Sequence, residues 1–377
     1  MKLKSYHKII IVAVVVVITG VLLYFLNQNQ IPKVISREGI AYERAVVTNV
    51  MENTLEKHEL TGAMTGTQKI EIRLLTGEQK GEVHQATNYA SYINNVICEK
   101  GTKLLISISN SQNVKTYSVY TYDRTTALLV AIVLFCLLLC LIGGKKGLKA
   151  LLSLALTFFF LLYLFIPLLY MGVSPIWAAI ILVIIATFIT MMLIDGWNAK
   201  TISAIIGTII CTSVSGILAL VAGHFLKISD YSMGDVDSLI QITQNTELKL
   251  DGLMFASILI VSMGAVMDIC MSIASAVNEL YIQNPDMTTG ALFRSGVSIG
   301  RDTMGTMSNT LILAFTGGYL TAIVSLFAYS YTLYEIFSQP DIINEIIQGL
   351  AGSAGLFLAV PIVAFVTSRL LKKFEVK

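Results

Sequence analysis

A chain of 377 residues that is 55% hydrophobic and only 13% charged does not have the composition of a soluble protein, because soluble domains carry charge on about 25% of their residues. Its formal net charge of +2 is too small to indicate nucleic acid as a partner. The mean hydropathy of +0.73 therefore predicts an integral membrane protein surrounded by membrane lipid.

The first 32 residues combine lysines with an apolar run from Ile9 to Leu26. This order is typical of a signal sequence. The run is 18 residues long, close to the roughly 20 residues that cross a bilayer. The residues from Tyr24 to Gln28 lack the small-x-small pattern that a signal peptidase requires. We predict a cytoplasmic N-terminus and an uncleaved signal anchor over residues 1–32, with a cleaved leader as the alternative.

Residues 33–124 have a different character, with frequent charges and no long apolar run. Short stretches with period-two alternation or β-branched residues predict about five strands. These stretches are Tyr42–Val50, Gln68–Leu75, Glu82–Ala86, Lys103–Ile108 and Thr116–Tyr122. Five short strands favour a small β-rich, OB-like domain between the first and second spans, and an irregular α+β cap is the alternative. Such a fold would not by itself indicate nucleic-acid binding.

Seven apolar segments then follow within residues 125–377, which predict a seven-helix membrane domain. They are Thr126–Ile142, Leu148–Met171, Ile176–Ile194, Thr201–Leu226, Leu253–Val277, Met304–Ser330 and Ile346–Leu371. With the anchor they make about eight transmembrane helices, and hence an α-helical polytopic membrane protein. The last six helices would form two three-helix halves of opposite orientation, as in inverted-repeat transporters.

The distribution of Lys and Arg predicts the orientation, because cytoplasmic loops carry the excess of basic residues. With a cytoplasmic N-terminus, 13 basic residues fall on the cytoplasmic side. The two short external loops, residues 227–251 and 331–345, then hold two lysines and many acidic residues. Both termini should therefore be cytoplasmic, with residues 33–124 outside. Apolar residues among the acids of residues 228–250 and 331–347 also predict short amphipathic helices there.

Two of the apolar segments carry charged and amide residues at helical spacing. One face of the first comprises Gly264, Asp268, Ser272, Ser275 and Glu279, and one face of the second comprises Asp302, Thr306, Asn309, Thr316 and Gly317. Uncompensated polar groups are costly in hydrocarbon, so we expect the two faces to turn toward each other or toward a watery cavity. We predict a substrate- or ion-binding site from eight residues of this stretch: Asp268, Ser272, Glu279, Arg294, Arg301, Asp302, Thr306 and Asn309.

Within this predicted site, Asp268 is the sharpest feature. It lies about 22 Å along its helix at 1.5 Å per residue, on the cytoplasmic half of the span. Two interpretations remain open: a buried ion-pair latch with Arg294 or Arg301, and a role in transport or proton relay. Asn309 is the residue most suited to a hydrogen bond between helices. The nearby glycines at positions 296, 300 and 305 would permit a broken or re-entrant helix.

Enzymatic, metal-binding and cofactor-binding readings have little support. The chain has no G-x-x-x-x-G-K-[ST] loop and no H-E-x-x-H helix, so ATP-driven pumping or zinc proteolysis by this chain alone is not expected. Met267 and Met271 beside Asp268 resemble soft Cu(I) ligands, but methionine more often fills irregular cores. We therefore expect no enzymatic activity, no metal site and no cofactor.

The paired motifs carry a family resemblance. Met267-Asp268 with Ser275 and Glu279, followed by Gly300-Arg301-Asp302-Thr303-Met304-Gly305-Thr306-Met307 and Asn309-Thr310-Leu311, resembles the signature of the YibE/YibF family of bacterial multipass membrane proteins. The order of anchor, external domain and helix block is also similar. The resemblance implies a multipass protein of the bacterial plasma (inner) membrane, with transport as the activity proposed for the family.

Two functions follow as hypotheses. The first is a permease or exporter component for an unidentified small solute or ion. The alternative is a non-transporting membrane scaffold or sensor whose external domain recruits a protein or envelope partner. A second copy of the chain or another protein is an expected partner in either case. A transporter should contain a solvated cavity that reaches Asp268, whereas a scaffold should bury the same side chains in a dry, paired network.

Overall fold

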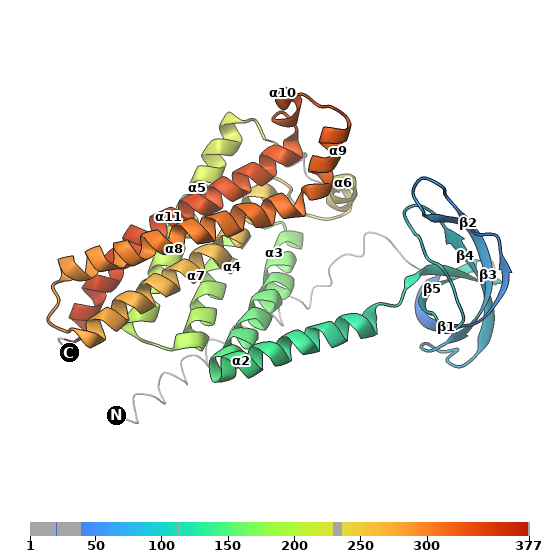
Figure 1. The fold of residues 1–377 in the computed structure, drawn as a ribbon, viewed down its shortest axis with the longest axis horizontal. Coiled ribbons are helices and arrows are strands. Elements are labelled where there is room, and N and C mark those ends of the chain that lie inside the picture. Colours follow the sequence, from blue (N-terminus) through green and yellow to red (C-terminus); the bar gives the residue numbers. More distant parts are fainter. Residues whose placement is uncertain (1–19, 21–38, 112–113, 229–235, 376–377) are drawn as a thin grey trace. The chain divides into compact units, whose positions relative to one another are not determined.

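The computed structural model describes residue 20 and residues 39–111, 114–228 and 236–375 (Figure 1). The predicted signal anchor, apart from Gly20, lies outside the described residues. The described chain forms two compact units that divide at residues 141 and 142. The first contains the strands and the beginning of the first long helix, and the second contains the remaining helices.

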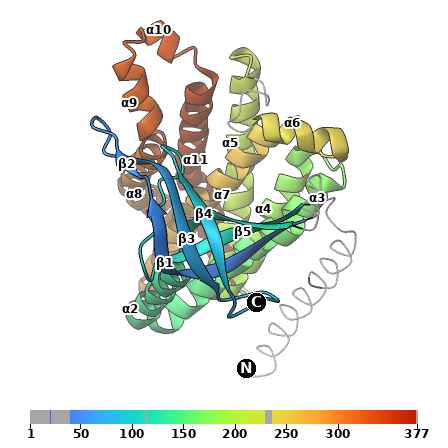
Figure 2. The ribbon, with the colours of Figure 1, turned by 90° about the vertical axis from the view of Figure 1, so that its right-hand side faces the viewer.

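The strands of the first unit form a small closed β-barrel. They are β1 (Ile40–Asn53), β2 (Glu56–Lys57), β3 (Met64–Leu74), β4 (Val83–Ala90), β5 (Lys103–Ser111) and β6 (Val114–Tyr122). The sheet runs in the order β1-β5-β6-β4-β3-β2, and an additional pairing of β1 with β3 closes it; Figure 2 shows the strands curving round the barrel. The β4–β6 pairing is parallel and the others are antiparallel. The predicted β-rich domain is confirmed, and the α+β alternative is wrong.

The period-two pattern of these strands builds the barrel core. In β3 the side chains of Gln68, Ile70, Ile72 and Leu74 are buried while those between them are not, because alternate residues of a strand point to opposite faces of the sheet. The core residues from all five long strands are joined by Val96 and Cys98 of the β4–β5 connection. Burial raises the pKa of the Cys98 thiol to about 12.

Two buried amides fasten the β4–β5 connection to the barrel. Asn88 donates to the side-chain oxygen of Gln68 at 2.9 Å and to the carbonyl of Val96 at 2.7 Å. Gln68 accepts from the backbone N–H of Cys98 at 2.9 Å and donates to its carbonyl at 3.1 Å. Such bonds are strong in a dry interior because water does not compete for the groups. The connection therefore has one defined path across the end of the barrel.

An ion pair joins the barrel to the start of the first long helix, α2 (Thr125–Phe160). Arg44 of β1 donates to the carboxylate of Asp123 at 2.7 Å, and the Asp123 side chain is only 2% exposed. Desolvation raises the pKa of Asp123, but hydrogen bonds from Thr125 and Arg44 outweigh it and hold the pKa below its usual range. The ionised carboxylate is therefore the form that the folded barrel stabilises.

The second unit is built of helices. They are the remainder of α2, the π-helix η1 (Leu161–Phe165), α3 (Ile166–Tyr170), α4 (Pro175–Asp195), α5 (Ala199–Phe225), α6 (Val236–Asn245), α7 (Leu253–Gln283), α8 (Thr289–Gly318), α9 (Leu320–Ala328), α10 (Leu333–Ile336) and α11 (Pro340–Glu375). Among the described residues, five helical runs are long and apolar enough to cross a membrane, or six if the bent pair α8–α9 is one span. The chain is a helical membrane protein. The number of transmembrane helices, eight, stays a prediction.

The helical run from Thr125 to Tyr170 counts as one of these five, where the sequence predicts two spans. It is interrupted at Gly144, whose φ of 52° and ψ of −132° are not helical, so two helices meet there. Only glycine adopts such angles without steric cost, because it has no Cβ. Further along, the π-helical turn η1 precedes Pro167. Proline removes a helical N–H and clashes with the preceding turn, and the wider turn accommodates it.

The predicted span Met304–Ser330 is not one straight helix. The helix α8 begins earlier, at Thr289, where Thr288 accepts a hydrogen bond from the N–H of Ala291 at 3.2 Å and caps the helix. It ends at Gly318, and α9 continues at an angle of 60°. The pair Gly317-Gly318 weakens the helix at this point because glycine has low helix propensity. The glycines at positions 296, 300 and 305 would permit a broken or re-entrant helix, but α8 is continuous there.

The predicted amphipathic segments are short helices. Residues 236–245 form α6, within the predicted range 228–250. In the range 331–347, Thr332 and Glu335 form a reciprocal capping box at the start of α10, and Pro340 begins α11. Both features follow from local sequence, since a Thr-x-x-Glu capping box and an N-terminal proline both favour a helix start.

The helix α7 occupies the centre of the membrane unit. It packs against α4, α5, α8 and α11, and α11 packs in turn against α5 and α8; α8 and α11 run side by side in Figure 1. The helices approach closely at these contacts because glycines there have no side chain to separate them. A Cβ added to Gly300 of α8 would lie 2.6 Å from Cγ1 of Val360 in α11, and one added to Gly296 would lie 2.6 Å from Cγ2 of Val277 in α7. Gly207 likewise leaves room for Val363.

We predict that Gly300→Ala destabilises the helix packing. The added methyl group meets the stiff, β-branched Val360, so we expect a loss of about 1–3 kcal/mol. The matched control is Gly305→Ala, five residues further along α8, where a Cβ would meet nothing within 4 Å. Thermal unfolding of the purified protein in detergent, followed by tryptophan fluorescence, measures both. Equal unfolding midpoints for the two variants would contradict the proposed close contact.

We also predict that Asp123→Asn destabilises the barrel at pH 7 by about 1 kcal/mol, because the variant loses charge-assisted hydrogen bonds. A depressed pKa stabilises the folded form above the unfolded pKa, near 3.8, and this stabilisation is lost as the pH falls through the lower folded value. The difference between wild type and variant should therefore vanish in acid.

The rate at which 4,4′-dithiodipyridine modifies the buried Cys98 measures barrel opening over this pH range, in a chain whose four other cysteines are replaced. Glu52→Gln is the control, since the Glu52–Lys69 pair is about 60% exposed on both sides and should change stability by less than about 0.5 kcal/mol. A wild-type advantage over Asp123→Asn that persists unchanged at pH 3 would refute the role given to this carboxylate.

Candidate functional site

The eight predicted site residues lie on two neighbouring helices, and all eight are exposed. On α7 they are Asp268, Ser272 and Glu279, and on α8 they are Arg294, Arg301, Asp302, Thr306 and Asn309. The sequence-based grouping by helix face is therefore correct for each helix. These faces lie on the outer surface of the helix bundle rather than in its core.

The opposite faces of the same helices explain this orientation. Val266, Ile273 and Val277 of α7 are fully or almost fully buried, and so are Leu292, Gly296 and Gly300 of α8. Apolar and small residues recur there every three to four positions, so each helix buries a complete stripe. The charged stripe on the other side of each helix must then point outward.

Along α7, the polar face consists of groups that bond only to their own helix. Ser272 donates to the carbonyl of Asp268 at 2.8 Å, and Gln283 donates to Glu279 at 3.3 Å. Gly264, one turn before Asp268, is exposed with open space where its side chain would lie. The carboxylate of Asp268 is therefore accessible from outside the bundle.

The face on α8 is similar. Thr306 donates to the carbonyl of Thr303 at 2.9 Å, and Thr310 donates to that of Thr306 at 2.9 Å. Neither hydroxyl reaches another helix. Arg301 and Asp302 lie near the middle of this 30-residue helix, just before the predicted span that begins at Met304.

The structure does not bring the two polar faces together. Among the described residues, no ion pair or hydrogen bond joins the side chains of Asp268, Arg294, Arg301, Asp302 and Asn309 to one another. The expected facing of the two helices through these groups is therefore wrong, and the latch of Asp268 with an arginine is not formed. Nor does Asn309 form the expected bond between helices.

Other polar groups that the sequence did not single out are small hydroxyls buried in the helix core. Thr212 of α5, Ser262 of α7 and Ser353 of α11 are at most 4% exposed, and their hydroxyls have no hydrogen-bond partner among the described residues. They were not among the site residues predicted from the sequence. The signal was present in α5, where Thr208, Thr212 and Gly216 recur every four residues, a spacing that marks one helix face.

Three pockets open elsewhere in the unit, near the ends of helices α5, α8 and α11. Their volumes are about 180, 510 and 410 Å³. None of the three is lined by Asp268 or by any other predicted site residue. Within the described residues, no group of three or more His, Cys, Asp or Glu side chains lies together as a metal site would require. The chemistry of the predicted site thus rests on carboxylates, guanidinium groups and amides.

Comparison with known proteins identifies the family. The model of the YibE/F-like protein family matches residues 131–373, well over half of the chain. The chain belongs to the YibE/F-like family. The matched residues include both polar faces and all the helices of the second unit, whereas the barrel, which ends at Tyr122, precedes them. No curated protein and no solved structure matches the chain significantly.

The exposed polar faces of this family member should be in contact with water. We predict that Ser272→Cys and Thr306→Cys react with a membrane-impermeant, cationic methanethiosulfonate in membrane vesicles. Their reaction should be at least about tenfold faster than that of a thiol held in apolar surroundings, because such surroundings suppress the thiolate.

The control for this experiment is Ile217→Cys, at an exposed apolar position of α5. All three cysteines are introduced into a chain whose five native cysteines have been replaced. Labelling of Ser272→Cys and Thr306→Cys as slow as that of Ile217→Cys would show that the polar faces are dry.

Proposed function

We propose that this YibE/F-like protein is a component of a membrane permease or exporter for a small solute or ion. One observation carries the proposal: charged and amide side chains in the middle of α7 and α8 face away from the helix core and are not paired with one another. The polar centre would consist of Asp268, Arg301, Asp302 and Asn309, with Arg294 as a partner toward the cytoplasm.

The cost of placing charge in lipid supports this proposal. A charged side chain at the centre of a bilayer costs at least about 2.5–3.5 kcal/mol. Asp268 lies inside a predicted span, and Arg301 and Asp302 border the next one. This cost is avoided when the faces line water, as in a transport pathway, or when another protein covers them. We infer that a second copy of the chain or another membrane protein completes the pathway, since oligomers commonly bury such surfaces.

The orientation and location follow from the charge distribution and the family. We propose that the protein lies in the bacterial plasma membrane with both termini in the cytoplasm and residues 33–124 outside. The excess of Lys and Arg on one side of the predicted spans supports this orientation. The solute would then cross between the cytoplasm and the compartment that holds the barrel.

A second candidate function is a scaffold or sensor, and one feature of the barrel favours it. Leu60, Tyr92 and Ile93 are 92%, 59% and 100% exposed, and the rings of His58 and Tyr92 lie 5.5 Å apart. Two adjacent loops thus present apolar side chains at one place, as recruiting surfaces do. We propose that the barrel is OB-like, since its five long strands pair in the order of that fold with one parallel pair; OB-like barrels bind ligands of several kinds.

The transport proposal is tested by reconstitution. Purified protein in liposomes is screened against a panel of ions and small solutes, and the solute that moves is used for the variants. We expect Asp268→Asn to lower its flux by about tenfold or more, because the charge at the centre of the pathway is lost. Asp286→Asn, at an exposed acid between α7 and α8, should leave the flux unchanged.

Both variants must retain the unfolding midpoint of the wild type for the comparison to be valid. Normal flux through well-folded Asp268→Asn would exclude the pathway described above. In that case, a cellular phenotype that Asp268→Asn leaves intact, but that is lost when the apolar loop residues of the barrel are replaced, would favour the scaffold.

A further inference from the structure

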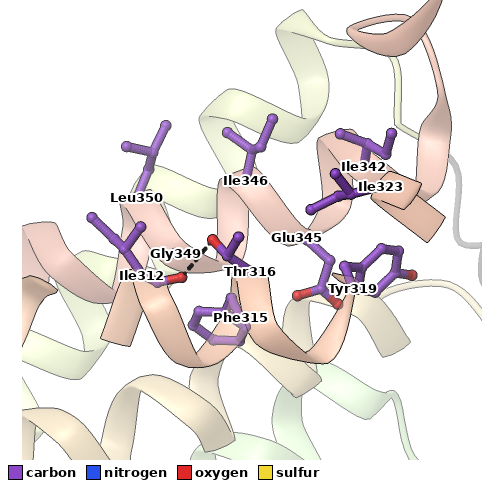
Figure 3. A pocket seen from close by; sticks show the side chains of 10 residues that line it. All are labelled: Ile312, Phe315, Thr316, Tyr319, Ile323, Ile342, Glu345, Ile346, Gly349 and Leu350. Carbon is purple, nitrogen blue, oxygen red and sulfur yellow. Dashed lines mark hydrogen bonds between the residues drawn. The ribbon is translucent and has the colours of Figure 1, made fainter. Parts of the chain in front are cut away.

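The bend between α8 and α9 creates a pocket that is separate from the predicted site. Its walls come from the last turns of α8, from Tyr319 at the bend, from Ile323 of α9 and from the first turns of α11 (Figure 3). The pocket has a volume of about 180 Å³, below the roughly 300 Å³ at which pockets for drug-sized ligands begin. Its size therefore suits a small ligand.

One carboxylate stands in this otherwise apolar pocket. Seven of the ten lining residues are Ile, Leu, Phe or Gly, and Glu345 is the single acid. The hydroxyl of Thr316 is already used, since it donates to the carbonyl of Ile312 at 2.9 Å (Figure 3). In the part of the chain that the structure describes, no ion pair or hydrogen bond is found for the Glu345 side chain. A half-buried carboxylate without a cation is a costly arrangement that a bound cation would relieve.

The aromatic walls of the pocket also favour positive charge. The rings of Phe315 and Tyr319 line it together with Glu345 (Figure 3), and aromatic faces attract cations. Carboxylate and rings thus act in the same direction.

The apolar walls decide what kind of cation fits. An inorganic ion such as Mg²⁺ or Ca²⁺ requires several oxygen ligands or its own water shell, and this pocket offers one carboxylate among isoleucines. An organic cation carries its charge on an apolar body, which the walls can bury. Quaternary ammonium groups in particular are bound by aromatic side chains.

We propose that this pocket binds a small organic monocation, a quaternary ammonium or protonated amine, with Glu345 as its counter-ion and Phe315 and Tyr319 against its apolar face. The site does not depend on the polar faces of α7 and α8. It forms at the 60° bend that follows Gly317-Gly318, which leaves Ile323 of α9 lining the same pocket as Ile342 and Glu345 of α11.

The test measures binding of choline to the full-length protein in nanodiscs by isothermal titration calorimetry. The comparison ligand is 3,3-dimethylbutan-1-ol, which has the shape of choline without its charge. On the wild-type protein, choline should bind at least about tenfold more tightly than the neutral alcohol. This comparison needs no variant and so does not depend on how a variant folds.

Variants then assign the charge. Glu345→Gln should weaken choline binding about tenfold and leave binding of the neutral alcohol within about twofold, because only the cation uses the carboxylate. Asp286→Asn, at an exposed acid between α7 and α8 that does not line the pocket, should change neither by more than about twofold.

Asp268→Asn should leave choline binding unchanged, so the failure of the transport pathway and the failure of this site are separate results. Absence of choline binding to the wild type, equal binding of choline and the alcohol, or full choline affinity in Glu345→Gln would each overturn the proposal.

Discussion

Close contact between helices α5, α7, α8 and α11 is the constraint on which the membrane unit depends. Without a hydrophobic driving force between helices in lipid, association relies on van der Waals packing, and small residues let the backbones approach. Gly296 and Gly300 do this for α8, and Gly207 does it for α5. A methyl group at any of these positions would collide with a neighbouring helix. The rotation of each helix about its own axis is therefore set by where its glycines lie.

This rotation places the charges. Gly296 and Gly300 face α7 and α11. The opposite side of α8, which carries Asp302 and Asn309, is therefore exposed. The same holds for α7, whose buried stripe of Val266, Ile273 and Val277 turns Asp268 to the surface. The core of this bundle is packed, but its outer surface carries charged residues that lipid does not stabilise. Our proposal of a pathway or a partner rests on these outward-facing charges rather than on an internal cavity.

The end of α8 shows how one local weakness makes a second kind of site. Up to Gly318 the helix follows α11, and beyond it the chain bends by 60°. In a straight helix, Phe315 and Tyr319 would lie on one face with no pocket beside them. With the bend, Ile323 of α9 lines a pocket together with these two rings and Glu345. The polar faces and the pocket thus arise from different glycines of the same helix. Gly296 and Gly300 allow close packing, and Gly317-Gly318 interrupts the helix.

Much of the architecture could be derived from the sequence because the relevant signals are local. Alternation with period two identified the strands of the barrel, and runs of about 20 apolar residues identified the helices. The helix faces that carry Asp268 and Asn309 were also correct, since spacing along one helix determines them. Which way a face points is a different question. It depends on which of the two opposite faces of the helix packs more tightly against other helices. That is decided only when helices distant in sequence come into contact.

The glycines of α8 illustrate the limit most clearly. From the sequence, Gly296, Gly300 and Gly305 would permit a broken helix, whereas in the structure Gly296 and Gly300 are sites of close packing and the helix bends after Gly317-Gly318. Glycine permits both outcomes, because the missing Cβ allows either an irregular backbone or a close neighbour. Composition and periodicity therefore determined that this is a helical membrane protein with a β-barrel domain. Only the tertiary contacts of Gly296 and Gly300 with Val277 and Val360 decided where α8 packs, where it bends and which of its side chains reach the surface.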